Sequence, residues 1–227
     1  MFKTTLLERR QVAEGTLELA FKRPEKFAFH AGQYLQLRLP KLLYRDRRGA
    51  SRVFSIASSP ADKERIIVAY RDTGSGFKQT LRESRIGSEV IIEGPHGFHL
   101  LPRQPARPVV LIAGGIGITS FMSMLRLNAE RDEVARPHIT LLYVNRSQRS
   151  AAYLDELKHF EKKSARLTVK TNFGIIDEKF ISTSVKNKDQ CLWYIAGPPF
   201  MVESAQGALE AMGVDSGRIY CEEFPGY

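Results

Sequence analysis

Two glycine-rich turns in the sequence carry groups that can bind a phosphate. The first, Gly114-Gly115-Ile116-Gly117-Ile118-Thr119, lies between a predicted strand and a predicted helix, where free amides at the helix N-terminus can hold an anion. Ser120 stands where the third glycine of the full dinucleotide fingerprint would be, so the segment fits either a phosphate cradle or a tight structural turn. The second, Gly74-Ser75-Gly76-Phe77-Lys78-Gln79-Thr80, offers amides, a lysine and a hydroxyl, or a simple helix cap. Two such turns favour one dinucleotide in each half of the chain.

The tetrapeptide Arg52-Val53-Phe54-Ser55 combines a permanent cation, an aromatic ring and a hydroxyl at the start of a predicted strand. Arg52 can pair with a pyrophosphate, and Ser55, on the same side of the strand as Val53, can hydrogen-bond a ring heteroatom. These groups suit a flavin. The simpler interpretation is a surface arginine next to a phenylalanine of the core.

Composition limits the kinds of cofactor and partner. Cys191 and Cys221 are too few for a zinc cage or an iron-sulfur cluster, so we expect no metal and an organic electron carrier. The net charge of +9 is scattered along the chain, which favours a solvated surface over a nucleic-acid platform and still permits an acidic protein partner. The apolar runs are far shorter than the ~20 residues of a membrane span, and the N-terminus lacks a secretory signal. We therefore expect no integral membrane segment and a cytoplasmic location.

The elements that must position these residues change character within Pro102–Pro108, where three of seven residues are proline. Residues 1–103 alternate apolar and polar positions in short strands, which predicts a six-stranded antiparallel barrel. The strand ranges recognised there are 16–21, 34–39, 53–57, 65–71 and 88–93. Residues 104–227 alternate buried-type strands with helices, which predicts a doubly wound α/β domain with a parallel sheet. Its strands are expected at 109–113, 139–144, 166–171 and 192–196, and its helices near 118–130, 151–163 and 200–212.

Several short motifs, taken in order, closely resemble the ferredoxin-NADP reductase family, in its form without an iron-sulfur domain. They are Phe29-His30-Ala31-Gly32-Gln33-Tyr34, Arg52-Val53-Phe54-Ser55, Gly76-Phe77-Lys78, Glu93-Gly94-Pro95-His96-Gly97, Gly114–Thr119, Tyr143-Val144-Asn145-Arg146, Gly197-Pro198-Pro199 and Glu222–Tyr227. The resemblance covers nearly the whole chain. It implies an FAD-binding barrel, an NAD(P)-binding α/β domain and NADPH or NADH as co-substrate.

The resemblance also implies roles for individual residues of the barrel. Arg52 and Val53 would lie at the flavin, with Arg52 on its phosphates, while Phe54 would lie beside the ring or the ribityl chain and Ser55 would hydrogen-bond near N5. Strand backbone at Val68 and Tyr70 would also contact the flavin. The pyrophosphate cradle would consist of Gly76, Phe77, Lys78 and Thr80, and the Gly-Ser-Gly-Phe-Lys turn favours FAD over FMN.

The nicotinamide dinucleotide would lie on the second domain. The residues implied for it are Gly114, Gly115, Gly117, Ile118, Thr119, Asn145, Arg146, Gly197, Pro198 and Pro199. Arg146 can pair with a 2′-phosphate or stack on adenine, so both NADPH and NADH stay open. Glu222 or Glu223 would supply electrostatics near the stacked rings. Tyr227 would approach the flavin face, or would seal the domain interface.

Three positions depart from the family pattern. Phe54 replaces a tyrosine, Ser120 replaces a proline after the threonine, and Ala196 stands where many members have cysteine. The implied function is nevertheless an FAD-dependent NAD(P)H reductase that moves hydride from nicotinamide C4 to flavin N5. Its electrons would pass to a small-molecule acceptor, an oxygenase component, or an acidic ferredoxin or flavodoxin. The alternative is a flavin-binding electron-transfer or regulatory subunit without independent turnover.

Overall fold

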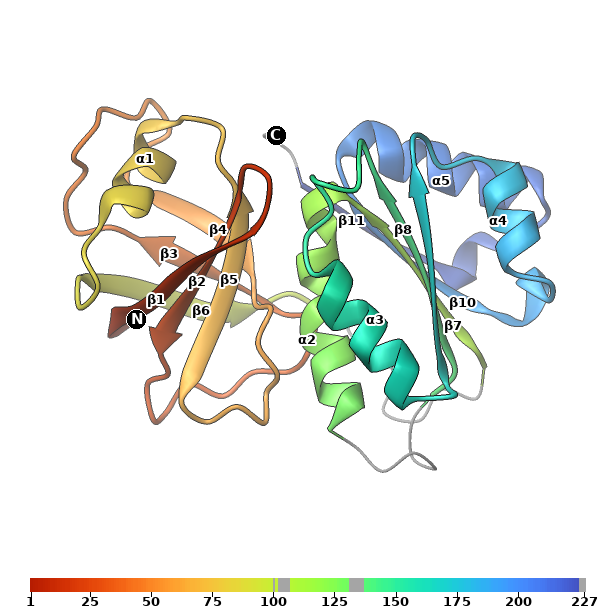
Figure 1. The fold of residues 1–227 in the computed structure, drawn as a ribbon, viewed down its shortest axis with the longest axis horizontal. Coiled ribbons are helices and arrows are strands. Elements are labelled where there is room, and N and C mark those ends of the chain that lie inside the picture. Colours follow the sequence, from red (N-terminus) through yellow and green to blue (C-terminus); the bar gives the residue numbers. More distant parts are fainter. Residues whose placement is uncertain (100, 102–106, 131–136, 225–227) are drawn as a thin grey trace.

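The structure is a computed structural model that describes residues 1–99, 101, 107–130 and 137–224 of the chain. A β-barrel domain and an α/β domain lie side by side (Figure 1). The predicted boundary between residues 103 and 104 lies outside the described residues and stays a prediction. Within the described part of the chain, no helix is long and apolar enough to cross a membrane.

Six antiparallel strands form the barrel domain, in the order β4-β3-β6-β1-β2-β5. In β3, Leu35 and Leu37 are fully buried and the residues after each are exposed, which is the period-two pattern of the sequence. The Ala57 N–H donates to the Ile67 carbonyl oxygen of β5 at 2.7 Å, so the two ends of the sheet meet and the sheet curls into a barrel. The strands are β1 (Phe2–Ala13), β2 (Thr16–Lys22), β3 (Tyr34–Arg38), β4 (Ser51–Ser55), β5 (Arg65–Arg71) and β6 (Glu89–His96).

The predicted six-stranded domain is confirmed, and the strand without an assigned range is β1. Only Thr4 and Leu6 of its twelve residues are buried, so its sequence lacks the clear alternation of apolar and polar residues that marks the other strands. The second glycine turn leads into α1 (Gly76–Glu83), whose first turn is capped by the Ser75 hydroxyl, an acceptor for the Lys78 N–H at 3.4 Å.

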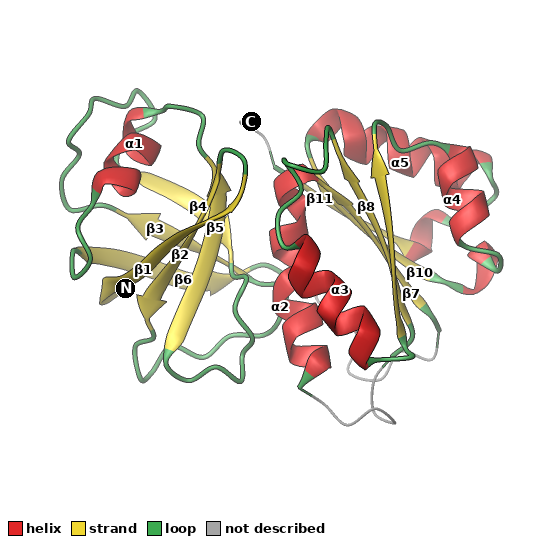
Figure 2. Ribbon diagram, viewed as in Figure 1, coloured by secondary structure: helices red, strands yellow, loops and turns green. Residues whose placement is uncertain are grey.

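Five parallel strands form the second sheet, in the order β11-β10-β7-β8-β9, which confirms the predicted α/β domain. Helices cover both faces of this sheet (Figure 2). Helices α2 and α3 pack on the face that includes Leu111, and α4 and α5 pack on the face that includes Ile112. The elements are β7 (Val109–Gly114), α2 (Ile118–Ala129), β8 (Ile139–Asn145), α3 (Leu154–Lys163), β9 (Leu167–Phe173), α4 (Glu178–Ser184), β10 (Leu192–Gly197), α5 (Pro199–Ala211) and β11 (Ile219–Glu223), with short 3₁₀ turns at Gly115–Gly117, Lys188–Gln190 and Ser216–Arg218.

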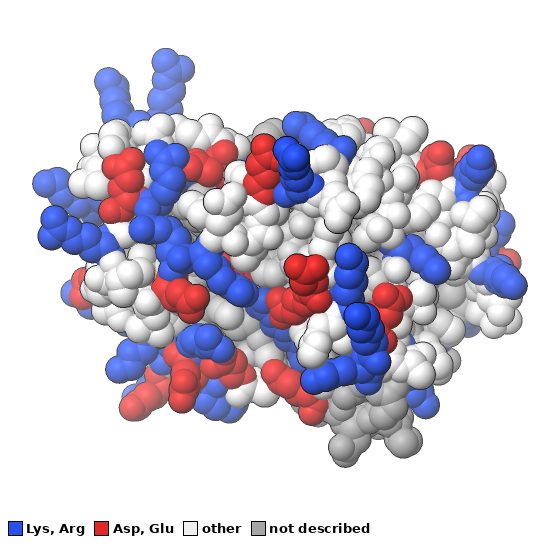
Figure 3. Space-filling view, in the orientation of Figure 1, with Lys and Arg blue, Asp and Glu red and all other residues white. Residues whose placement is uncertain are grey.

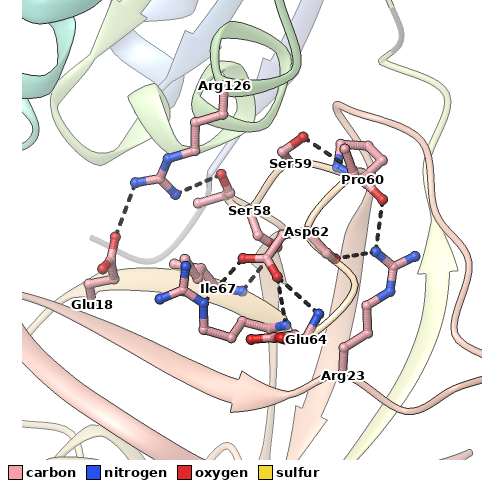
Figure 4. A network of polar contacts seen from close by, with 12 residues as sticks. Glu18, Arg23, Ser58, Ser59, Pro60, Asp62, Glu64, Ile67 and Arg126 are labelled. Atoms are coloured by element: carbon pink, nitrogen blue, oxygen red, sulfur yellow. Dashed lines mark hydrogen bonds and ion pairs between the residues drawn. The ribbon is translucent and has the colours of Figure 1, made fainter. Parts of the chain in front are cut away.

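Helix α2 faces the barrel with three polar residues spaced three apart, here called the polar row: Ser120, Ser123 and Arg126. The Ser123 hydroxyl donates to the Ser58 carbonyl oxygen at 2.6 Å, and Arg126 Nη1 donates to the Ala57 carbonyl oxygen at 2.9 Å. Figure 4 shows Arg126 reaching from α2 towards the barrel, where its Nη2 lies 3.4 Å from Glu18 Oε2. The polar row therefore joins the two domains through directional hydrogen bonds as well as apolar packing.

Candidate functional site

A cavity of about 640 Å³ lies between the barrel strands β3, β4 and β5, the start of α1, and β11 of the other domain. Pockets for small molecules and cofactors usually measure about 300–1,000 Å³. The predicted site residues that line it are Arg52, Val53, Phe54, Tyr70, Lys78, Glu222 and Glu223. The rest of its lining is Tyr34, Gln36, Asp46, Arg48, Ser51, Thr73, Ser75 and Phe224.

A larger hollow of about 800 Å³ surrounds Arg126 at the domain interface. Several of its charged groups pair with one another, since Arg126 contacts Glu156 at 2.7 Å and Arg10 contacts Glu18 at 2.5 Å. None of the predicted site residues lines it. Size alone therefore does not identify the functional site, and the 640 Å³ cavity has the chemically suitable lining.

One end of the 640 Å³ cavity is cationic. Arg52 Nη2 lies 2.6 Å from Asp46 Oδ1, and both side chains are almost fully buried. Lys78 is buried as well, and this burial lowers the pKa of its amine to about 8. Because that pKa is still above 7, the amine remains mainly protonated at neutral pH. Two cations close to the N-terminus of α1 favour an anionic group at this end.

Asp46 places a carboxylate of the chain itself at this cationic end. Its oxygens accept hydrogen bonds from the Phe77 N–H at 2.9 Å, the Arg48 N–H at 2.8 Å and Arg52. Burial alone would raise the pKa of Asp46, but these hydrogen bonds outweigh it and lower the pKa to about 2. Asp46 thus binds two of the groups that the sequence assigns to a pyrophosphate.

The loop that carries Asp46 also lies against the rest of the second glycine turn. The Thr80 hydroxyl oxygen accepts the Leu43 N–H at 3.0 Å and donates to the Gly76 carbonyl oxygen at 2.7 Å. A Cβ atom on Gly76 would lie only 2.3 Å from the Arg45 carbonyl oxygen. Glycine is needed here because the backbone of this loop approaches closely.

An aromatic cluster lies beside the cationic end. The Phe54 ring stacks on Phe77 with centroids 6.2 Å apart and lies 6.1 Å from Tyr70. Val53 precedes it with 59% of its surface exposed, although it is an apolar strand residue. An exposed valine beside stacked rings gives the cavity an apolar wall that suits a flat heterocycle.

The other end of the cavity leads to a chain of hydrogen bonds between the domains. The Ser55 and Ser120 hydroxyl oxygens lie 3.0 Å apart, and the Ser120 hydroxyl donates to Glu222 Oε2 at 2.7 Å. Ser55 and Ser120 are buried and do not line the cavity, whereas Glu222 does. Burial raises the pKa of Glu222 above its ordinary value, and the hydrogen bond from Ser120 lowers it in part.

The first glycine turn lies where β7 and β10 end side by side. The sheet order places the reversal of strand order between these two strands, which is the position where α/β sheets bind ligands. A Cβ atom on Gly114 or on Gly197 would lie 2.3 Å from the Met201 methyl carbon, and one on Gly117 would lie 2.2 Å from the Ala196 carbonyl oxygen. Gly114 and Gly197 thus leave room for the Met201 side chain of α5, and Gly117 lets the turn before α2 pack against the end of β10.

Gly115 differs from the other glycines of this turn. Its φ is +53°, a Cβ atom there would meet nothing within 4 Å, and its carbonyl oxygen accepts from the Tyr143 hydroxyl at 3.2 Å. Neither α2 nor α5 has a side-chain cap at its N-terminus among the described residues. Two uncapped helix N-termini at one edge of the sheet can bind phosphate oxygens.

The remaining predicted residues occupy different surroundings. Asn145 is buried at the end of β8, whereas the next residue, Arg146, is exposed. Ile118 and Thr119 are buried in the first turn of α2, Pro198 and Pro199 are half-buried at the start of α5, and Val68 is buried in the barrel core. Tyr227 lies outside the described residues. The ligand roles assigned to all these residues stay predictions.

Comparisons with known proteins agree with this architecture. The family profile described as "Oxidoreductase NAD-binding domain" matches residues 111–207. A mutant of the ferredoxin-NADP+ reductase of Plasmodium falciparum, in complex with 2'P-AMP, superposes with a TM-score of 0.78 at 18% identity, over 98% of this chain and 95% of that one. This fold and the NAD-binding domain match agree with the resemblance of the chain to the ferredoxin-NADP reductase family. The FAD/NAD-binding domain of a Vibrio cholerae nitric oxide dioxygenase, another chain of this fold, superposes with a TM-score of 0.84 at 17% identity, over 98% of both chains.

A curated relative of this chain is the electron transfer component of 2-halobenzoate 1,2-dioxygenase from Burkholderia cepacia. The two are 29% identical over 236 residues, which cover 97% of this chain and 66% of the relative. The chain spans between 56% and 67% of the length of several curated relatives, this one among them.

Sequence patterns missed two residues that shape the site. Asp46 lies in a polar loop, and its link to Phe77 spans 31 positions, so no local motif indicates it. Ser120 was visible only as a departure from the family pattern, because its partner Glu222 lies 102 positions away.

Proposed function

We propose that this chain is an FAD-dependent NAD(P)H reductase that passes electrons to a separate acceptor. The observation that carries the proposal is the 640 Å³ cavity, which joins a cationic end at α1 to Glu222 of the NAD-binding domain. A flavin in this cavity would touch both domains, as hydride exchange with a nicotinamide on the second domain requires.

The lining of the cavity fits FAD. Val53 and Phe54 supply an apolar wall for the ring system, and Arg52 and Lys78 supply cations for the pyrophosphate. Asp46 holds Arg52 in a fixed position, and Ser75 and Thr73 line the same space. When bound, FAD would accept a hydride from the nicotinamide and release electrons one at a time.

The residues of the chain would act mainly by positioning. The uncapped N-termini of α2 and α5 would bind the phosphates of the nicotinamide dinucleotide beside Gly115. The Glu222 carboxyl group would lie beside the ring system, either ionised or protonated. The polar row would hold the two domains in a fixed relative position. Glu223, on the same strand, lines the cavity and is exposed to solvent.

The choice of co-substrate rests on Arg146, which is exposed where β8 ends. Its guanidinium can pair with the 2′-phosphate of NADPH, and no acidic residue occupies that position to favour the NADH ribose. We therefore favour NADPH. Replacing Arg146 with Ala should raise KM for NADPH about tenfold and leave KM for NADH unchanged, which steady-state kinetics with both donors would test.

The proposed acceptor is a protein with an acidic surface, such as a ferredoxin, a flavodoxin or an oxygenase component. Lys and Arg side chains project from the end of the molecule that holds the barrel, with Asp and Glu among them (Figure 3). The loop before β4 contributes exposed Lys41, Arg45, Arg47 and Arg48, and Arg48 also lines the cavity. A basic rim at the cavity would steer an acidic partner to it. Relatives that are electron transfer components of dioxygenases agree with this assignment. A cytoplasmic location is part of the same proposal.

The test is anaerobic stopped-flow absorbance of FAD-loaded protein mixed separately with NADH and NADPH. Rapid bleaching of the long-wavelength flavin band with NADPH, and slower bleaching with NADH, is the expected result. Bound FAD that bleaches with neither donor would contradict an independent reductase. That outcome would support a flavin-binding electron-transfer or regulatory subunit.

A further inference from the structure

Ser55, Ser120 and Glu222 form an unbroken chain of hydrogen-bonding groups across the domain interface. Ser55 is on β4 of the barrel, Ser120 is in the first turn of α2, and Glu222 is on β11. The two steps of the chain measure 3.0 Å and 2.7 Å, and the Ser120 side chain has no exposed surface. Water therefore does not compete for the Ser120 hydroxyl, and its partners alone decide where its proton points.

The protonation state of Glu222 fixes the direction of both hydrogen bonds. A carboxylate only accepts, so an ionised Glu222 takes the single proton of the Ser120 hydroxyl. The Ser120 oxygen must then accept from Ser55, and Ser55 is left as an acceptor towards any further group. A protonated Glu222 can donate to Ser120, which frees Ser120 to donate to Ser55 and Ser55 to donate onward.

We propose that Ser120 is a positioning residue that couples the protonation of Glu222 to the hydrogen-bond direction of Ser55, and through it to the electron affinity of the bound flavin. This inference rests on the proposed function, since it needs a flavin beside Ser55. Ser120 occupies a position where the related family pattern has proline, which has no side-chain hydroxyl and could not make this link.

Several other titratable groups share a cavity with Glu222, and their effects on the flavin must be distinguished from the effect of Glu222. Those that share its cavity are Tyr34 on β3, Asp46 and Arg48 on the loop before β4, Arg52 on β4, Tyr70 on β5, Lys78 on α1 and Glu223 on β11. The neighbouring β11 residue Cys221 contacts Gln206 of α5, and Ala196 of β10 lies opposite Glu222 in the sheet. Only a variant that alters Ser120 itself separates its contribution from these charges.

The polar row supplies a matched control for Ser120. Ser123 lies one turn further along α2, is equally buried and donates to the Ser58 carbonyl oxygen across the same interface at 2.6 Å. Ser120→Ala and Ser123→Ala each remove one buried hydroxyl that joins the domains. If Ser120 acts only as a structural link, the two variants should behave alike.

The experiment measures the reduction potential of bound FAD against pH in the wild type, Ser120→Ala, Ser123→Ala and Glu222→Gln. We expect an inflection at the pKa of Glu222 in the wild type and in Ser123→Ala, and none in Ser120→Ala or Glu222→Gln. An inflection that persists unchanged in Ser120→Ala, or that disappears in Ser123→Ala as well, would overturn the proposal.

A second measurement does not depend on the flavin. The carboxyl carbon of Glu222, followed by ¹³C NMR in the full chain before FAD is added, should titrate at a higher pH in Ser120→Ala, because the hydrogen bond that lowers its pKa is lost. Ser123→Ala should leave that titration unchanged. An unchanged Glu222 titration in Ser120→Ala overturns the role of Ser120 whether or not FAD binds, whereas failure to bind FAD contradicts the proposed function.

Discussion

The helices α1 and α2 both begin at a glycine turn, yet the chain fills the two turns differently. At α1, Asp46 accepts the Phe77 amide and the loop backbone lies against Gly76. At α2, Gly117 lies against the end of the neighbouring strand β10, and no described side chain caps the helix. The turn at α1 is thus occupied by an anion of the chain itself, whereas no described side chain occupies the turn at α2.

A glycine turn before a helix therefore does not by itself reveal which neighbouring group requires the glycine. A Cβ atom at Gly76 would meet the backbone of a surface loop, whereas one at Gly117 would meet the backbone of a buried strand. Of Gly76, Gly115 and Gly117, Gly115 alone combines a positive φ with open space around it. Four variants distinguish these three situations by their effects on stability and on ligand binding.

The largest effect is expected from Gly117→Ala. The new Cβ atom would lie 2.2 Å from the Ala196 carbonyl oxygen, in the middle of a sheet that cannot move aside. We expect the free energy of unfolding to fall by about 3 kcal/mol or more, as in other overpacked cores. Urea denaturation followed by circular dichroism would measure it, and a loss below about 1 kcal/mol would show that β10 can yield.

A smaller loss is expected from Asp46→Asn, because Arg52 would lose a nearly buried charged partner. The free energy of unfolding at pH 7 should fall by about 2 kcal/mol, the scale of a hydrogen bond to a charged group. Since the pKa of Asp46 is lowered to about 2 in the folded protein, its contribution is complete above pH ~4 and is lost as the pH falls towards 2.

The difference between the wild type and Asp46→Asn should therefore shrink as the pH is lowered from 5 to 2. Urea denaturation at several pH values in this range would test the sign. A difference that stays constant over this range would mean that the charge of Asp46 does not stabilise the loop.

Gly76→Ala should cost less than Gly117→Ala, although the clashes are similar in distance. The new Cβ atom would lie 2.3 Å from the Arg45 carbonyl oxygen, but Arg45 is in an exposed loop that can move away. We expect a loss of about 1–2 kcal/mol in unfolding free energy. Tryptic digestion after the loop arginines should become faster, because the loop leaves α1. Equal losses in the two glycine variants would remove the contrast between the turns.

The smallest effect on stability is expected from Gly115→Ala. Its φ of +53° costs a non-glycine residue about 1 kcal/mol, and no neighbour lies within 4 Å of the new methyl group. The methyl group would stand at the uncapped amides, however, so the Kd for NADPH should rise by about tenfold or more, or ~1.4 kcal/mol. Fluorescence titration with NADPH would measure this. Unchanged NADPH binding would mean that the phosphates lie elsewhere.

Particular elements show which parts of the fold and the site could be predicted from the sequence. β7 was predicted with nearly correct bounds because a strand buried on both faces reads as an unbroken apolar run. α4 and β11 were not predicted, since α4 has only Ile181 buried and β11 has no fully buried residue. The cavity residues Arg52 and Lys78 were found because local motifs contain them, whereas Asp46 and the link from Ser120 to Glu222 arise only when distant segments pack together.

The polar row of α2 also has a consequence for dynamics. Its three members are spread over about 9 Å of helix axis, and each forms a hydrogen bond to a different residue of the barrel segment from Ser55 to Ser58. A small hinge rotation about one contact would stretch the other two, so the domains separate in one cooperative step or stay closed. Amide protons of α2 and of this barrel segment should therefore exchange with solvent at a common rate.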